Sequence, residues 1–228
     1  MITHRSPAAR AGLGRVSFVS LVLFSLLGFG ACGGGSEPAG NSANNNQARP
    51  AASPAPAASP TPADPNRKNP VAVIETGLGN IKIELLEDQS PKTAENFRKL
   101  AESGFYNNLV FHRTVSGFMI QGGDPNGNGT GGRTASGAPL PNEISRNSPL
   151  YSGGYKRGSV AMANKGTPET GSSQFFIMHQ NYPLPPNYTI FARVIEGIEV
   201  VDKIATAPLA RPETPRAPVA MKRVYIQK

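Results

Sequence analysis

Residues 111–124 read Phe-His-Arg-Thr-Val-Ser-Gly-Phe-Met-Ile-Gln-Gly-Gly-Asp, and they are the most informative stretch of this chain. Within nine residues they hold a permanently charged donor, Arg113, an amide, Gln121, and two large apolar side chains, Phe118 and Met119. Two later segments, residues 162–164 (Met-Ala-Asn) and 172–176 (Ser-Ser-Gln-Phe-Phe), again place amides beside apolar side chains. Apolar side chains with a few polar groups at their edge are typical of a ligand pocket.

The first 32 residues have the pattern of an export signal. Residues 1–15 carry three arginines and no acidic residue, residues 16–29 are apolar, and Gly30 and Ala31 precede Cys32. A charged start, a short apolar core and small residues are typical of a secretory signal, and a membrane span needs about 20 apolar residues. The segment resembles the bacterial lipoprotein signal, in which the cysteine is lipidated, although Phe29 stands where that pattern favours Leu. We therefore expect lipidation at Cys32.

Two alternatives stay open for this segment. Cleavage after Ala31 without lipidation gives a periplasmic or secreted protein, and an uncleaved signal acts as an anchor. In each case the protein is exported to the cell envelope, and we expect a membrane-anchored lipoprotein. Cys32 is the only cysteine of the chain, so the folded part forms no disulfide.

The remaining chain divides into a linker and one domain. Residues 33–69 are rich in Gly, Asn, Ala, Ser and Pro and lack the apolar residues that a core needs, so we expect a flexible tether. Residues 70–228 form a domain that is large enough to bury a core. The chain has a net charge of +8, but residues 70–228 hold 17 basic and 13 acidic residues without a basic run, which argues against nucleic-acid binding.

Alternating apolar and polar residues in this domain predict many short strands. Residues 71–75 and 80–85 flank Gly77-Leu78-Gly79 and predict a β-hairpin. Ser90 as N-cap, Pro91 in the first turn and Gly104 as the stop predict a helix with an apolar face at positions 94, 97, 100 and 101. We expect further strands at residues 110–113, 118–121, 159–162, 175–179, 189–194 and 221–227, and a second helix at 199–205. This pattern predicts a mainly β protein, a small closed barrel capped by two helices.

The three motifs occur in an order that resembles the cyclophilin family of peptidyl-prolyl cis/trans isomerases, and the resemblance extends from Val71 to the C-terminus. It implies a closed eight-stranded antiparallel barrel and an enzyme that rotates X-Pro peptide bonds without a cofactor. It also implies that Arg113 is the catalytic arginine, with Gln121 beside it. Without this motif, the expected role of an arginine such as Arg113 would be that of a partner in a surface salt bridge.

The resemblance also implies a set of substrate-binding residues. Phe118, Met119, Phe176 and Leu184 line the proline pocket, while amide groups and main chain bind the substrate backbone. Alternation along the strands directs Phe111 and Phe175 away from the pocket and into the core. The implied substrate-binding residues are Phe118, Met119, Ala163, Asn164, Gln174, Phe176, Leu184, Tyr188 and His112, the last of which is also consistent with a packed structural histidine.

The sequence lacks the residues that metal binding, phosphate binding or hydrolysis would need. His112 and His179 have no second histidine, cysteine or acid at metal-ligand spacing, so we expect no metal. The glycine-rich residues 122–132 lack the lysine and hydroxyl pair of a phosphate-binding loop and no apolar helix follows them. No nucleophile elbow is present for hydrolysis.

The sequence therefore predicts a monomeric, exported isomerase that acts on proline-containing polypeptides during folding. The main alternative is a non-catalytic peptide-binding or holdase module on the same barrel, and a purely structural barrel is a third. Residues 182–188 depart from the family pattern, because Pro183 replaces its usual Trp and Tyr188 replaces a common His. Since the Trp indole is associated with cyclosporin binding in the family, we expect weak cyclosporin binding.

Overall fold

Ten strands and two α-helices lie in the part of the chain that the structure describes. A computed structural model describes residues 69–167 and 169–228, so the predictions for residues 1–32 and for 33–68 lie outside the described residues. The elements in chain order are β1 (Val71–Thr76), β2 (Gly79–Leu85), α1 (Pro91–Glu102), β3 (Arg113–Val115), β4 (Met119–Gly122), a 3-10 turn (Pro149–Tyr151), β5 (Ser159–Met162), β6 (Phe175–Met178), β7 (Ile190–Glu196), α2 (Ile198–Ala205), β8 (Leu209–Arg211), β9 (Thr214–Pro215) and β10 (Met221–Ile226).

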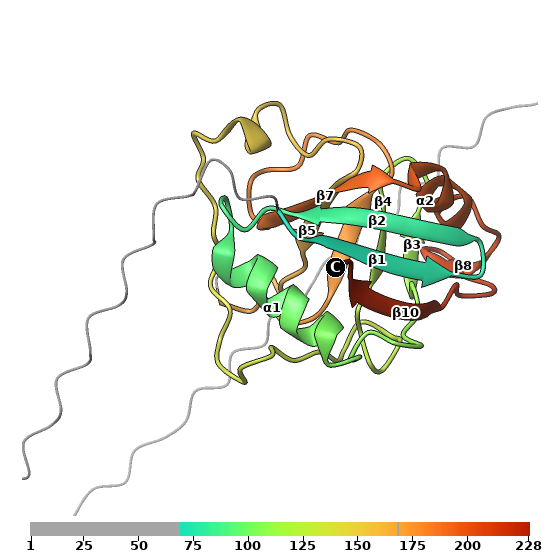
Figure 1. The fold of residues 1–228 in the computed structure, drawn as a ribbon. Helices are drawn as coiled ribbons and strands as arrows, with labels where there is room; N and C mark the ends of the chain where they lie inside the picture. The colour runs from blue at the N-terminus through green and yellow to red at the C-terminus, as the bar shows by residue number, and fades with distance from the viewer. Residues whose placement is uncertain (1–68, 168) are drawn as a thin grey trace, which may run out of the picture. The chain divides into compact units, whose positions relative to one another are not determined.

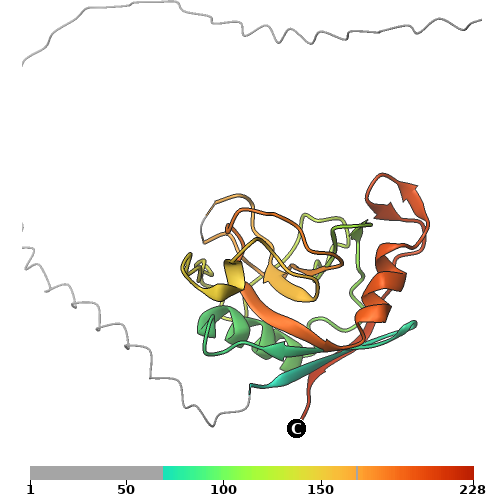
Figure 2. The ribbon, with the colours of Figure 1, turned by 90° about the horizontal axis from the view of Figure 1, so that it is seen from above.

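Eight of these strands form one antiparallel sheet in the order β10-β1-β2-β7-β5-β6-β4-β3. The sheet curls around the core as an open half-barrel, with α1 against one side and α2 near the other end (Figures 1 and 2). The mainly β fold with two helices is thus confirmed. The prediction of a closed barrel is wrong, because β10 and β3 lie at the two edges of the sheet and do not pair as strands.

The gap between the edge strands β3 and β10, the seam of the open barrel, has a local cause in the sequence. The predicted strand at residues 110–113 lies later, at Arg113–Val115, and the chain before it makes only scattered contacts across the seam. Val110 and Ala220 form an isolated bridge, and the amide of Phe111 donates to the carbonyl of Val219 at 3.0 Å. Pro215 and Pro218 precede β10 and carry no amide hydrogen, so a continuous ladder cannot form there.

Helix α1 begins at the predicted position but is capped by another residue than the sequence suggests. The side chain of Ser90 makes no capping hydrogen bond and donates instead to the carbonyl of Ile190 at 3.0 Å. The first turn is capped by Glu143, whose carboxylate accepts from the amides of Lys92 at 3.0 Å and Thr93 at 2.7 Å. A carboxylate also suits the positive end of the helix dipole, so Glu143 ties the loop before β5 to α1.

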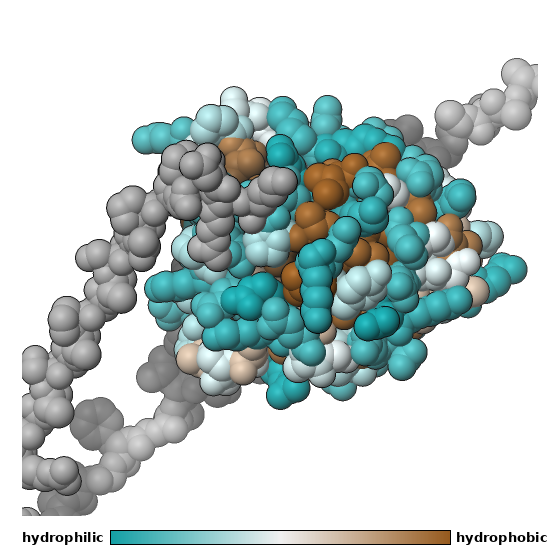
Figure 3. All heavy atoms as spheres, in the orientation of Figure 1, coloured by the Kyte–Doolittle hydropathy of each residue, from teal (hydrophilic) through white to brown (hydrophobic). Residues whose placement is uncertain are grey.

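The core lies between α1 and the concave side of the sheet. The ring of Phe97 stacks on Tyr106 at 4.9 Å and meets Phe175 edge-on at 5.4 Å. Phe111 and Phe175 are fully buried here, which confirms the prediction from strand alternation. On the side of β1, β2 and β10 the surface is mostly hydrophilic, with apolar side chains visible between charged ones (Figure 3).

Gly104 follows α1 with a φ of +72°, a left-handed conformation that ends the helix as expected.

Within residues 69–167 and 169–228, none of the helices has the length and apolar character to cross a membrane.

Candidate active site

The register of three neighbouring strands places the predicted site residues in one row. Arg113 on β3 pairs with Gln121 on β4, and Gln121 pairs in turn with Phe176 on β6. Because residues two apart on a strand share a face, Met119 joins Gln121 on the same face of β4. The sheet therefore carries a charged donor, an amide and an aromatic ring side by side on its outward face, away from the core of Phe111 and Phe175.

A cavity of about 310 Å³ opens over this row. It combines an apolar floor with a polar rim, since Met119 and Phe176 are almost fully buried while Arg113 and Asn164 lie at the edge. Nine residues line it, and all are among those that the sequence analysis selected: Arg113, Phe118, Met119, Gln121, Ala163, Asn164, Phe176, Leu184 and Tyr188. The structure brings them together, and their individual roles stay predictions.

A chain of side-chain hydrogen bonds fixes the polar edge of this cavity. The guanidinium of Arg113 donates from Nη1 to Oε1 of Gln121 at 3.3 Å. Gln121 donates from Nε2 to Oε1 of Gln174 at 2.9 Å. Gln174 in turn donates to the carbonyls of Gly129 at 3.0 Å and Gly131 at 2.7 Å. The orientation of Arg113 is therefore determined by a network that runs into the glycine-rich loop.

Glu213 is a member of this network that the sequence analysis missed. It lies between β8 and β9 with a φ of +61°, and its Oε2 accepts from Nε of Arg113 at 2.7 Å. The hydrogen bond from Arg113 and its positive charge lower the pKa of Glu213. No sequence pattern connects the two residues, because the contact joins positions a hundred residues apart.

The apolar wall of the cavity depends on a second missed residue, Tyr155. Its hydroxyl donates to the carbonyl of Tyr188 at 2.7 Å and accepts from the amide of Tyr188 at 2.9 Å. The ring of Tyr188 then meets Phe176 edge-on at 5.4 Å. Tyr155 is fully buried, and burial raises its pKa, so the hydroxyl stays protonated at neutral pH. Tyr155 lies in a glycine-rich turn without periodicity, so no sequence signal identifies it.

The opposite wall is formed by Phe118 and stabilised from outside the cavity. The ring of Phe118 packs on Tyr182 with ring centroids 4.4 Å apart. Tyr182 and Pro183 lie directly above Gly154, where a side-chain carbon would stand only 2.5 Å from the carbonyl oxygen of Tyr182. Only glycine fits at position 154, which has a φ of +83°.

Two predicted substrate-binding residues lie outside the cavity lining. His112 is buried, and neither ring nitrogen has a hydrogen-bond partner among the described residues. Burial lowers the pKa of His112, with Arg113 acting in the same direction and Asp124 in the opposite one, so the ring is neutral at pH 7. Gln174 is also buried, and its amide is engaged by Gln121 and the glycine-rich loop. The structure thus gives Gln174 a supporting position next to the cavity.

The glycine-rich loop folds around a carboxylate. Asp124 accepts from the amides of Asn126 at 2.9 Å, Asn128 at 3.0 Å and Gly129. Burial alone would raise the pKa of Asp124, but these three donors outweigh it and lower the pKa below the ordinary aspartate value. Gly123 passes so close to the carbonyl of Ser173 that any side chain would collide. The amides of this loop thus donate hydrogen bonds to Asp124, and the carbonyls of Gly129 and Gly131 accept from Gln174.

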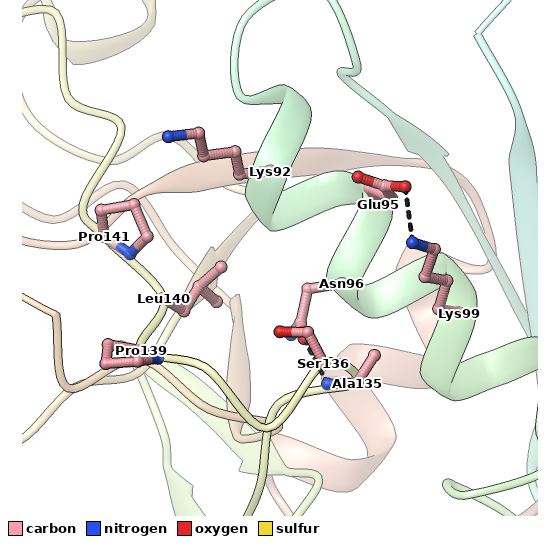
Figure 4. Close-up of a pocket in the computed structure, with 9 residues that line it drawn as sticks. All are labelled: Lys92, Glu95, Asn96, Lys99, Ala135, Ser136, Pro139, Leu140 and Pro141. Atoms are coloured by element: carbon pink, nitrogen blue, oxygen red, sulfur yellow. Dashed lines mark hydrogen bonds and ion pairs between the residues drawn. The ribbon is translucent and has the colours of Figure 1, made fainter. Parts of the chain in front are cut away.

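A second hollow of about 230 Å³ runs along α1 and faces Leu140 (Figure 4). Two pairs of its polar groups are engaged with each other: Lys99 contacts Glu95 at 2.8 Å, and Asn96 accepts from the amide of Ala135 at 2.8 Å. No group of three or more His, Cys, Asp or Glu residues that could hold a metal occurs in the part of the chain that the structure describes. The cavity at Arg113 is therefore the better candidate for a functional site.

Comparison with known proteins identifies the family. The family described as "Cyclophilin type peptidyl-prolyl cis-trans isomerase/CLD" matches residues 71–226. The chain belongs to the cyclophilin-type peptidyl-prolyl cis-trans isomerases. It is 44% identical over 154 residues to "Peptidyl-prolyl cis-trans isomerase CYP18-1" of Arabidopsis thaliana, which is 67% of this chain and 93% of that protein. It is 43% identical over 137 residues to human "Peptidyl-prolyl cis-trans isomerase-like 3", 60% of this chain and 82% of that protein.

Solved cyclophilins share the fold. A crystal structure of a cyclophilin-type isomerase from Cryptosporidium parvum matches with a TM-score of 0.65 at 36% identity, over 70% of this chain and 98% of that one. A second structure of the same protein, in the presence of the dipeptide Ala-Pro, matches with a TM-score of 0.64 at 35% identity, over 69% and 99%. The predicted cyclophilin family and isomerase class are thus confirmed. These relatives are eukaryotic and give no support to a bacterial lipoprotein form.

Proposed function

We propose that this cyclophilin accelerates rotation about X-Pro bonds of polypeptide chains that enter the cavity of Arg113. One observation carries the proposal: the guanidinium of Arg113 lies at the edge of an apolar cavity built by Met119, Phe176 and Phe118. A proline ring requires such an apolar slot, and its peptide nitrogen then lies near the charged rim. The Ala-Pro dipeptide in the related crystal structure is consistent with this class of substrate.

Catalysis by Arg113 follows from the electronic structure of the peptide bond. Rotation must overcome a barrier of about 18–20 kcal/mol, because it interrupts amide resonance. In the twisted state the prolyl nitrogen recovers its lone pair and accepts a hydrogen bond, which it cannot do when planar. A donor that acts only on the twisted state lowers the barrier. Lowering it by about 5–6 kcal/mol corresponds to about four decades in rate.

The donors of Arg113 are arranged for this role. Nε is engaged by Glu213 and Nη1 by Gln121, while Nη2 has no hydrogen bond within residues 69–167 and 169–228. Because the guanidinium is planar, fixing Nε and Nη1 also fixes the direction of Nη2. The substrate therefore does not have to order a free side chain, which would cost entropy. Arg113 is therefore held ready before the substrate arrives.

Main-chain and amide groups on the cavity rim hold the substrate backbone in this proposal. Asn164 lies at the rim and donates from Nδ2 to the carbonyl of Asn187 at 2.9 Å, which fixes its orientation. The amide of Ala163 is engaged by the carbonyl of Gln174 at 2.9 Å, so the carbonyl of Ala163 is its available main-chain group. Leu184 and Tyr188 close the side of the cavity next to Asn164.

The decisive experiment compares Arg113→Ala with wild type in a proline-isomerisation assay on the intact chain. We expect kcat/KM to fall by at least about 10²-fold, because one charged donor at a transition state is typically worth 2.7–4 kcal/mol. Arg193→Ala is the matched control, since Arg193 contacts Glu84 at 2.6 Å on the surface in the same way. Retained peptide binding without any wild-type turnover would instead favour the holdase alternative.

We further propose that the protein is an exported, lipid-anchored monomer that acts on folding polypeptides in the cell envelope. The support is the sequence alone: an arginine-bearing start, a short apolar run and Cys32 directly after Ala31. Several acyl chains on the N-terminal cysteine would give a stable anchor, and residues 33–69 would act as the spacer. Export by simple cleavage after Ala31 and an uncleaved signal that acts as an anchor are the alternatives.

Fractionation of a bacterial expression host tests this proposal. Wild type should be found with the membranes and carry a diacylglyceryl group on Cys32 by mass spectrometry. Cys32→Ser should move to the soluble fraction or accumulate as an unprocessed precursor. Soluble wild type that begins at an unmodified Cys32 would show simple secretion, and soluble protein with residues 1–31 retained would rule out export.

A further inference from the structure

His179 connects the wall of the cavity to α2. It follows β6 directly and is 7% exposed. Its Nδ1 accepts from the amide of Gly117 at 3.0 Å, and its Nε2 lies 3.3 Å from Oδ1 of Asp202 on α2. The ring thus spans from the turn between β3 and β4 to the second helix, and it does so without lining the cavity itself.

The two contacts determine the state of the ring. An amide N–H can only donate, so Nδ1 of His179 must be the unprotonated nitrogen and Nε2 must carry the proton. Nε2 then carries its hydrogen 3.3 Å from Oδ1 of Asp202. Asp202 is held by Arg157 through two hydrogen bonds of 2.7 Å, and the hydrogen bond from Arg157 lowers the pKa of Asp202. The carboxylate of Asp202 is therefore ionised, and its negative charge lies beside the Nε2 edge of the ring.

The same residue also holds the turn through its main chain. The amide of His179 donates to the carbonyl of Phe118 at 2.8 Å. Gly117 has a φ of +79°, and no atom lies within 4 Å of where a side chain would begin, so the turn has no packing of its own at this position. His179 therefore adds two hydrogen bonds to the one within the turn, from the amide of Phe118 to the carbonyl of Val115 at 3.0 Å. Phe118 is the residue that this turn presents to the cavity.

We propose that His179 is a positioning residue for the isomerisation: by accepting from Gly117, it fixes the turn that places Phe118 against the substrate proline. This inference rests on the proposed function of the cavity. The effect of His179 is indirect, through the position of Phe118, whose ring also packs on Tyr182.

Two substitutions test the acceptor. His179→Asn places an amide oxygen near the position of Nδ1, so it can accept from Gly117. His179→Leu has similar size and no acceptor. We expect His179→Asn to keep kcat/KM within about twofold of wild type and His179→Leu to lose about tenfold, because the amide of Gly117 then loses its acceptor and the turn is held less firmly.

A signal that does not depend on activity completes the test. The amide resonance of Gly117, followed by NMR in the intact protein, should stay near its wild-type position in His179→Asn and shift in His179→Leu.

A loss of kcat/KM of more than about twofold in folded His179→Asn overturns the proposal, and so does a Gly117 amide resonance in His179→Leu that matches wild type. Wild-type activity in folded His179→Leu, checked by circular dichroism, also overturns it. If wild type shows no isomerase activity, the proposed function fails, and the Gly117 signal still decides whether His179 holds the turn. Should His179→Leu fail to fold, the comparison of wild type with His179→Asn decides alone.

Discussion

Nε of Arg113 donates to Oε2 of Glu213 at 2.7 Å, across a separation of a hundred residues in the chain. Both side chains are partly exposed, at 39% and 50%, so water screens the ion pair and its contribution to stability is small. The ion pair matters because it orients Arg113. Glu213 binds Nε and Gln121 binds Nη1, so the remaining N–H donors of the guanidinium are left to the substrate.

We expect Glu213→Ala to lower kcat/KM by about two- to fivefold, because an exposed ion pair contributes about 0.2–1 kcal/mol to holding Arg113. Glu213→Gln, which keeps an acceptor, should lie between this variant and wild type. Steady-state isomerase kinetics measure both. Glu84→Ala is the control, since it breaks a surface pair of similar length with Arg193 far from the cavity. Equal losses in Glu84→Ala and Glu213→Ala would contradict the orienting role.

Arg113→Lys distinguishes a fork of donors from a point charge. Lysine keeps the positive charge but cannot contact Glu213, Gln121 and substrate at fixed angles. We expect its kcat/KM to stay at least about tenfold below wild type, with unchanged unfolding in urea. Activity close to that of wild type would mean that charge alone is sufficient.

Asp124 makes the stability of the domain depend on pH. Its folded pKa is lowered, so its contribution is present above the ordinary aspartate pKa and is lost as pH falls through the folded value. Asp124→Asn replaces one acceptor by a donor facing loop amides, and we expect it to cost about 2 kcal/mol at pH 7. Urea unfolding of both proteins at pH 7 and at about pH 3 checks this. The difference should shrink at the lower pH, and a constant difference would contradict the assignment.

Cyclosporin should inhibit the wild type weakly. Pro183 stands where the family carries a Trp indole, and proline offers neither its N–H donor nor its apolar area. The missing hydrogen bond and buried surface correspond to about two orders of magnitude in affinity. Titration of isomerase activity should show tighter inhibition of Pro183→Trp than of wild type, with uninhibited rates alike because Pro183 does not line the cavity. Tight inhibition of the wild type would show that Tyr182 supplies the missing contact.

Local patterns in the sequence predicted the elements whose cause is local. The span of α1 follows from Pro91 and Gly104, and its apolar face packs into the core as expected. Strand β5 agrees with the predicted residues 159–162. Strand alternation also separated the core side, with Phe175, from the cavity side, with Phe176.

What the sequence could not predict depends on contacts between distant segments. The cap of α1 by Glu143, the anchoring of Tyr188 by Tyr155 and the fixation of Arg113 by Glu213 all join residues that no periodicity relates. The hairpin of β8 and β9, which carries Glu213, is short and exposed and lacks an alternating pattern. The prediction of a closed barrel is wrong because Pro215 and Pro218, before β10, lack the amide hydrogens that a continuous ladder needs.

The pairing of β1 with β10 has a consequence for synthesis. The partner of Ala72 is Ile226, so the first strand of the domain is completed by the strand of this sheet that is translated last. Glu213, too, is made a hundred residues after Arg113. A nascent domain therefore has an unpaired strand edge on β1 and an incomplete arginine site until these segments have been made, and contacts of such long range form slowly. This enzyme of protein folding can complete its own fold only after β10 has left the ribosome.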